Sequence, residues 1–247
     1  MRRGTAALLA IAAAGLLAGG GALVQRRRLH WIRVLTARIP AHHTHWQQRG
    51  RVDAGTILYV ALGDSAALGI GASAPDAGYV GLVAEEIDAI TGERVRVRNL
   101  SIDGATLAVC IRDELPRLAK LQPDVCTLAI GANDVWTFEP ERFAAEFATI
   151  CDALPAGSIV SELPSFSVLP VARRVRAANR IIHEIAAAHG YPVAPLTATT
   201  SVGGLVAALL GSAGDLFHPN DRGHRRWAAA FLPLVRDAVA RSPAAPA

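Results

Sequence analysis

Cysteine is scarce in this chain, whose 247 residues include only Cys110, Cys126 and Cys151. Three thiols cannot close a disulfide framework, and none stands in the C-x-x-C spacing of a structural zinc site. Charged residues are also few, at 19%, and 51% of the chain is hydrophobic, which excludes a disordered protein. A chain of this length and composition can bury a sizeable core, and we expect one large domain with additional segments.

Acidic residues are nearly absent from the first 55 positions, which hold nine arginines and one acid, Asp53, for a net charge of +8. Residues 56–247 carry 16 basic and 20 acidic residues, a net charge of −4. The basic character of the chain therefore belongs to its N-terminal segment. We expect no nucleic-acid surface on the mildly acidic remainder.

Charge is missing altogether from residues 4–24, and arginines flank this run on both sides. As a helix, the run is long enough to cross a hydrocarbon core of about 30 Å, and it exceeds the apolar region of about 7–15 residues in a signal peptide. We predict that residues 1–28 form a single-pass membrane anchor. A cleaved signal, which would release a secreted protein, and a buried helix are the alternatives.

Two features of the sequence favour opposite sides of the membrane for the folded domain. Five arginines follow the run within about 15 residues and two precede it, which favours a cytoplasmic C-terminal side. The basic start resembles that of an export signal and favours the opposite orientation. We predict a cell-membrane location with the folded domain outside the cytoplasm.

Residues 29–55 have the composition of a juxtamembrane linker. Trp31, Arg33 and their neighbours suit an interfacial helix that ends before Pro40. The histidines at positions 42, 43 and 45 have no carboxylate or cysteine beside them. We interpret them as part of a solvated linker and predict no metal site.

From residue 56 to residue 241, short apolar runs alternate with helical periodicity. We expect strands at 56–62, 95–100, 125–130, 158–163 and 192–196, helices at 79–90, 107–121, 140–154, 171–189 and 221–240, and a helical turn at 205–210. This alternation predicts a parallel sheet with helices on both faces. Residues 242–247 are expected to be a frayed tail.

Polar residues and glycines follow three of these strands, and an Asp-x-x-His precedes the last helix. The segments are Gly63-Asp64-Ser65, Ser101-Ile102-Asp103-Gly104, Gly131-Ala132-Asn133-Asp134 and Asp215-Leu216-Phe217-His218-Pro219. Ligands of such sheets bind at the carboxyl ends of the strands, so we expect the four segments to meet there.

This set of residues is suited to acyl transfer. A serine such as Ser65 is a weak nucleophile that needs a base, and His218 can supply it with Asp215 holding the imidazole. The oxyanion requires fixed N–H donors, for which the backbone of Ser65 and Gly104 and the amide of Asn133 qualify.

The four segments, in this order, resemble the blocks of the SGNH family, also called GDSL hydrolases, over about residues 56–230. The resemblance implies a flavodoxin-like three-layer α/β/α sandwich with a mostly parallel five-stranded sheet, and a serine esterase or lipase without a cofactor. It implies Ser65 as nucleophile, Asp215 and His218 as its partners, and Ser65, Gly104 and Asn133 as the oxyanion hole. One departure is Leu216, which stands where many members have glycine.

The same residues and a neighbouring segment allow other interpretations. Ser65 alone also suits a helix N-cap, and His224 competes with His218 for the role of base. The segment 69–74 matches a G-x-G-x-x-A dinucleotide fingerprint but lies too far beyond the expected strand.

For the whole protein we predict hydrolysis of a small-molecule, lipid or glycan acyl ester. An acyltransferase or deacetylase on the same site, and a non-catalytic binding protein that keeps the fold, are the alternatives. The sequence leaves the oligomeric state open.

Overall fold

The computed structural model describes residues 2–52, 55–166 and 171–242, with side chains described from Gly21 onward except that of Val52. The expected frayed tail lies outside the described residues apart from Ser242.

Five strands form one sheet in the described part of the chain: β1 (Leu58–Gly63), β2 (Arg96–Asn99), β3 (Val125–Ala129), β4 (Ile159–Ser161) and β5 (Val193–Ala194). All neighbouring pairs are parallel, and the order across the sheet is β2-β1-β3-β4-β5. Strand β2 lies on one side of β1 and β3 lies on the other, so the connections after these strands diverge. Such a reversal of strand order opens a crevice at the carboxyl ends of the strands. The predicted five-stranded parallel sheet is confirmed.

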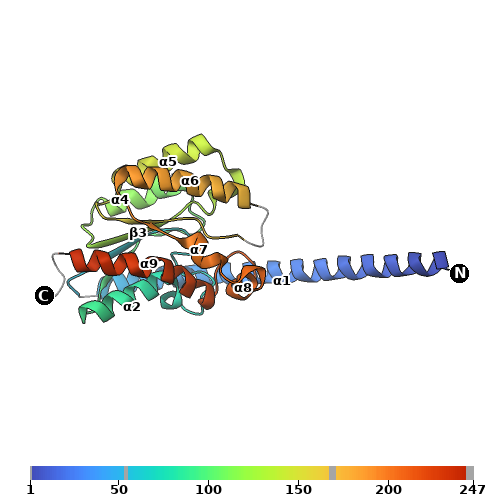
Figure 1. Ribbon diagram of the computed structural model, residues 1–247. Helices are drawn as coiled ribbons and strands as arrows, with labels where there is room; N and C mark the ends of the chain where they lie inside the picture. Colours follow the sequence, from blue (N-terminus) through green and yellow to red (C-terminus); the bar gives the residue numbers. More distant parts are fainter. Residues whose placement is uncertain (1, 53–54, 167–170, 243–247) are drawn as a thin grey trace.

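Helices cover both faces of this sheet, as Figure 1 shows. One layer contains α1 (Arg2–Val52), α2 (Tyr79–Thr91) and α9 (Asp221–Arg241), and the other contains α5 (Pro140–Ala153) and α6 (Ala172–His189). Side chains of β1 alternate between the two cores because successive residues of a strand point to opposite faces. Tyr59 packs with the α2 and α9 layer, and Val60 and Leu62 pack with the α5 and α6 layer.

Helix α1 differs most from the sequence prediction. It runs through Pro40 to Val52, and its first part projects from the rest of the molecule (Figure 1). Leu35, His42 and Trp46 are buried against the domain, so the prediction of a solvated linker with a helix ending before Pro40 was wrong. These residues recur at helical spacing and form one face, which packs into the core. Pro40 is exposed and is tolerated because the packing of this face stabilises the helix.

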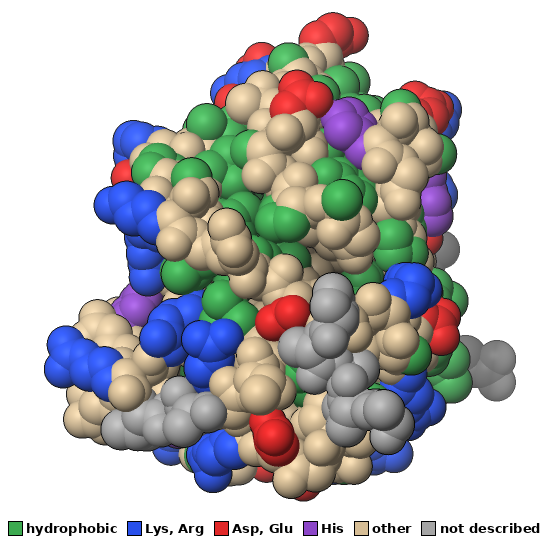
Figure 2. Space-filling model, turned by 90° about the vertical axis from the view of Figure 1, so that its left-hand side faces the viewer, with side chains coloured by type: hydrophobic (Ala, Val, Ile, Leu, Met, Phe, Trp, Pro, Cys, Tyr) green, Lys and Arg blue, Asp and Glu red, His purple; other side chains and the backbone are tan. Residues whose placement is uncertain are grey.

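The predicted membrane anchor lies mostly outside the residues whose side chains are described. Among the described residues, no helix combines the length and the apolar character that a membrane crossing requires. The backbone of residues 4–24 belongs to the projecting part of α1. Figure 2 shows the opposite end of the molecule, where basic and acidic side chains both reach the surface.

The remaining helical segments are short. They are η1 (Pro75–Ala77), α3 (Leu107–Val109), η2 (Cys110–Glu114), α4 (Leu115–Leu118), η3 (Asp134–Thr137), α7 (Leu196–Ser201) and α8 (Gly204–Gly211). The predicted helix 107–121 is thus divided, with η2 a π-helical segment. Pro116 lacks the N–H that would continue a regular α-helix, which explains the break. Helix α7 was not predicted because its Leu-Thr-Ala-Thr-Thr-Ser sequence has weak helix propensity.

Candidate active site

Ser65 stands in the turn that follows β1. Asp64 fixes this turn by accepting a hydrogen bond from the Ala66 N–H at 2.9 Å through its side chain and one from the Ala67 N–H at 3.0 Å through its carbonyl. Gly63, at φ 150°, begins the turn, and a Cβ there would lie 2.4 Å from the Ala129 carbonyl oxygen of β3. Only glycine therefore lets β1 and β3 approach this closely at the serine.

His218 joins Ser65 to Asp215. Its Nε2 lies 2.9 Å from the Ser65 Oγ, and its Nδ1 lies 2.6 Å from the Asp215 Oδ2. Asp215 can only accept when ionised, so Nδ1 carries the proton and Nε2 is free to accept from the serine hydroxyl. The structure thus brings together the three residues that the sequence assigned to catalysis, from segments 153 positions apart.

Asp215 is buried and held as a carboxylate. Burial raises its pKa, but hydrogen bonds from the His218 ring and from the backbone N–H groups of Phe217 and His218 lower it by more. The pKa of Asp215 therefore lies below its ordinary value. An ionised Asp215 keeps the His218 ring in one orientation and stabilises its protonated form.

Leu216 has the backbone conformation of a glycine. Its φ of 61° is the only positive value of a non-glycine residue among those described. A left-handed conformation costs a side-chain-bearing residue about 1–2 kcal/mol. Glycine adopts this conformation without that cost, so Leu216 holds the turn between Asp215 and His218 under backbone strain.

The predicted oxyanion donors follow three neighbouring strands: Ser65 follows β1, Gly104 follows β2 and Asn133 follows β3. The Asn133 Nδ2 donates to the Ala105 carbonyl at 2.9 Å, and its other contact, with the Asp64 carboxylate, is long at 3.5 Å. Within the described ranges, the backbone N–H groups of Ser65 and Gly104 donate to no acceptor of the chain. The Asn133 amide is thus fixed, and the two N–H groups are unoccupied.

His224, the competing candidate for the base, is a structural residue. It is fully buried, its Nδ1 accepts from the Tyr79 N–H, and its Nε2 donates to the Ile70 carbonyl, both at 3.2 Å. Burial lowers the pKa of His224 to about 4, so the ring is neutral. Both ring nitrogens are therefore engaged away from Ser65.

The N-terminal histidines also have structural contacts. The His42 Nδ1 donates to the Leu68 carbonyl at 2.9 Å, and the His45 Nε2 lies 3.1 Å from the Asp76 carboxylate. No cluster of three or more potential metal ligands occurs in the residues that the structure describes.

Helix α1 reaches the site, which the sequence analysis missed. The Arg28 Nε donates to the Asp215 carbonyl at 3.2 Å, and Trp31 packs so closely on Gly214 that a Cβ there would lie 2.0 Å from its ring. The Trp46 Nε1 donates at 3.0 Å to the same Leu68 carbonyl that His42 contacts. The signal available was the shared helical face of Leu35, His42 and Trp46, which continues past Pro40.

Glu114, also missed, lies beneath the turn that carries Ser65. Its Oε2 accepts from the Gly63 N–H at 2.9 Å, and its Oε1 has no hydrogen-bond partner among the described residues. Burial raises the pKa of Glu114 to about 8, against the effect of the Gly63 hydrogen bond. Glu114 directly follows Arg112 and Asp113 in the sequence, so no local signal distinguishes it as the buried acid of the π-helical segment η2.

Glu114 is expected to make stability decline toward alkaline pH. A carboxyl whose pKa is raised on folding favours the folded state below its unfolded pKa, and this contribution is lost as the pH rises through about 8. Glu114→Gln keeps an oxygen for the Gly63 N–H but cannot ionise. Between about pH 5 and pH 8 the wild-type Tm should therefore fall more than that of Glu114→Gln. Glu85→Gln, on the exposed side of α2, should follow the wild type, whereas parallel curves for all three proteins would contradict the prediction.

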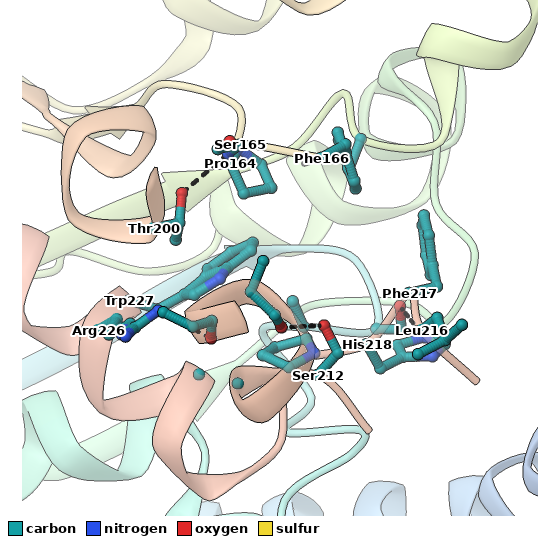
Figure 3. A pocket seen from close by; sticks show the side chains of 18 of the residues that line it. Pro164, Ser165, Phe166, Thr200, Ser212, Leu216, Phe217, His218, Arg226 and Trp227 are labelled. Carbon is teal, nitrogen blue, oxygen red and sulfur yellow. Dashed lines mark hydrogen bonds between the residues drawn. The ribbon is translucent and has the colours of Figure 1, made fainter. Parts of the chain in front are cut away.

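A mostly apolar pocket opens beside Ser65 and His218 (Figure 3). Its walls come from the loop after β4, from α7, α8 and α9, and from the loop that carries Asp215 and His218. Figure 3 shows Phe166 opposite Phe217, and the two rings stack with centroids 5.7 Å apart. Trp227 and the α8 residues Ala207 and Ala208 extend the apolar lining. A pocket of this kind suits the hydrocarbon part of a ligand whose polar group lies at Ser65.

Solved structures that are similar to this chain include the following three. TesA matches with a TM-score of 0.60 and 24% identity, over 73% of this chain and 99% of its own. A lipase/acylhydrolase from Enterococcus faecalis matches with a TM-score of 0.59 and 23% identity, over 78% and 100%. An acetylxylan esterase from Geobacillus stearothermophilus matches with a TM-score of 0.57 and 22% identity, over 74% and 95%. Likeness at these identities establishes the fold. No match was found among curated protein sequences.

The family model of the GDSL-like lipases and acylhydrolases matches residues 61–226, more than half of the chain. The matched range contains Ser65, Gly104, Asn133, Asp215 and His218. This match supports ester hydrolysis as the general activity. The chain belongs to the GDSL-like lipase/acylhydrolase family.

Proposed function

We propose that the protein is a serine esterase that hydrolyses acyl esters through an acyl-serine intermediate. The observation that carries the proposal is the contact chain from the Ser65 Oγ through His218 to Asp215, at 2.9 Å and 2.6 Å, beside an apolar pocket. A serine within hydrogen-bond reach of an oriented histidine is the arrangement that activates a hydroxyl nucleophile.

In the first half of the reaction, the Ser65 Oγ attacks the ester carbonyl while the His218 Nε2 takes the hydroxyl proton. The tetrahedral intermediate collapses, the bond to the alcohol oxygen breaks, and His218 returns the proton to the leaving alcohol. In the second half, water attacks the acyl-Ser65 carbonyl with His218 again as base. The carboxylic acid leaves, and Ser65 regains its proton.

The oxyanion of both tetrahedral intermediates is stabilised by the N–H groups of Ser65 and Gly104 and by the Asn133 amide. The backbone N–H groups make no other hydrogen bond in the described ranges, so they are available to a developing negative charge. The Ala105 carbonyl and Asp64 hold the Asn133 amide in place. Donors that are positioned before the reaction need no reorganisation when the charge forms.

The intermediate itself provides the test. Wild-type protein is mixed with water-soluble p-nitrophenyl esters of increasing acyl length, quenched with acid and analysed by peptide mass spectrometry. We expect a mass increase equal to the acyl group on the peptide that contains Ser65, and none with Ser65→Ala. A substrate consumed at an unchanged rate by Ser65→Ala would contradict the proposal.

We also propose that residues 4–24 anchor the chain in the cell membrane with the catalytic domain outside the cytoplasm. The support is the uncharged sequence of this run, its flanking arginines and its place at the projecting end of α1. A form that begins at Gly21 lacks most of this run and tests the anchor by membrane fractionation.

A further inference from the structure

Helix α8 is apolar on every side. Its sequence, GLVAALLG, contains no polar side chain, and its residues Ala207 and Ala208 line the pocket beside Ser65. Large apolar side chains reach the surface on its other side, with Val206 68% exposed. We call this set the α8 surface: Val202, Leu205, Val206, Leu209 and Leu210. A helix without a polar face is stable when an apolar environment covers it.

The α8 surface lies close to the point where α1 leaves the domain. Trp31 of α1 packs on Gly214 and Arg28 contacts Asp215, just after the end of α8 at Gly211. On the same stretch of α1, Leu29 and Ile32 are exposed. Trp31 is seven residues beyond the end of the uncharged run 4–24, or about 10 Å along the helix axis. The pocket wall and the α8 surface therefore lie near the end of the uncharged run, at the place where α1 leaves the domain.

Exposed arginines stand on α1 and α9, the two helices next to this apolar surface, and α9 also carries Asp221 in its first turn. They are Arg26, Arg27 and Arg33 on α1 and Arg222 and Arg225 on the first turns of α9, which packs on α8 through a hydrogen bond from Arg226 to the Ala207 carbonyl. No acidic residue occurs in α1 or α8. The opposite end of the molecule, by contrast, carries both signs of charge (Figure 2). Apolar side chains with basic residues beside them are typical of surfaces that bind anionic lipid.

We infer that the α8 surface docks on an anionic lipid bilayer and that the substrate is a long-chain acyl ester which passes from that bilayer into the pocket. The inference rests on the proposed esterase activity for its substrate and on the α8 surface for its docking. Helix α8 separates the two environments: its outer side chains enter the lipid, and Ala207 and Ala208 face the acyl chain at Ser65. The arginines contact the lipid head groups.

Docking can be measured without catalysis. Full-length Val206→Cys is labelled with an environment-sensitive fluorophore, which is selective because all three native cysteines are buried. The matched control is Ile90→Cys on α2, another exposed aliphatic position, 41% exposed. With vesicles of equal parts phosphatidylglycerol and phosphatidylcholine, we expect a blue shift at position 206 and none at position 90.

Three results would overturn the docking inference or part of it. The first is an unchanged spectrum at position 206. The second is a blue shift without vesicles that grows with protein concentration, which would make the α8 surface a contact between copies of the chain. The third is an equal blue shift with vesicles of phosphatidylcholine alone, which would show that the arginines do not contribute to docking.

The substrate class is tested with the double variant Val206→Ser/Leu210→Ser, whose positions lie outside the pocket lining. Its activity on a short soluble ester should stay within about twofold of the wild type, while activity on a long-chain ester in anionic vesicles should fall about tenfold or more. Ile90→Ser should change neither activity. Equal loss on both esters would mean that the substitutions damage the fold, and no loss on vesicles would overturn the inference. Failure of the wild type on the soluble ester would instead refute the proposed esterase.

Discussion

Replacement of His218 by alanine is expected to lower kcat on a soluble ester by roughly 10³-fold or more, and Ser65→Ala should cost a similar factor. The two side chains act as one unit, because the serine hydroxyl is activated only while the His218 Nε2 can take its proton at 2.9 Å. The double variant should therefore be little worse than either single variant, since the second change removes a contact that the first has already broken.

Two other histidines serve as controls. His183 is exposed and its Nε2 lies 2.9 Å from the Glu162 carboxylate, away from Ser65, so His183→Ala should leave kcat unchanged. His224→Gln should lower the Tm, because the His224 ring is fully buried and bonded through both nitrogens, but the folded fraction should keep its kcat. If His224→Gln abolished turnover while His218→Ala stayed near normal, the assignment of the base would be wrong.

Removal of α1 is expected to destabilise the fold and abolish activity on a soluble ester. A fragment of residues 55–247 loses Leu35 and Trp46 from the core, each worth about 1.5–3 kcal/mol, and total stability is typically about 5–15 kcal/mol. The buried Leu68 carbonyl also loses both of its side-chain donors, His42 and Trp46. That carbonyl follows the Ser65 turn, so the nucleophile itself should shift.

The form that begins at Gly21 separates this structural role from anchoring. It keeps every contact described for α1, so its Tm and its activity on the soluble ester should match those of the full chain. Only the full chain should stay in the membrane fraction after a high-salt wash, because salt screens the contacts between arginines and lipid head groups that hold a protein docked through the α8 surface alone. A fragment 55–247 with near-normal Tm and activity would show that α1 is dispensable, and a full chain found only in the soluble fraction would refute the anchor.

The sequence was sufficient to predict the sheet and the meeting of the polar segments at its edge for one physical reason. Parallel strands place their carboxyl ends at one edge, so residues that follow β1 and β3 meet there however far apart they are in the chain. Ser65 and Asn133 could therefore be placed together, and Asp215 could be paired with His218 from their spacing of three.

The contribution of α1 could not be predicted in the same way. Its second half contains histidines, arginines and Pro40, and these polar residues lower the mean hydropathy of the stretch. The mean hides the fact that Leu35, His42 and Trp46 share one helical face. Glu114 was missed because the sequence reads as a regular helix across positions 107–121. The π-helical turn that directs Glu114 toward Gly63 depends on Pro116 and on a tertiary contact that no local pattern contains.

The left-handed Leu216 has a consequence for how acyl preference can change. Its side chain is part of the pocket wall, while its backbone sets the path between Asp215 and His218. A mutation of Leu216 that reshapes the pocket also alters the backbone that positions His218. A change of this residue that shifts the preferred acyl-chain length should therefore also lower kcat. Phe166 reaches the pocket from a separate loop, and its link to the turn is a side-chain stack on Phe217, not the backbone of the turn. Variation at position 166 should therefore be the easier evolutionary route to a new substrate range.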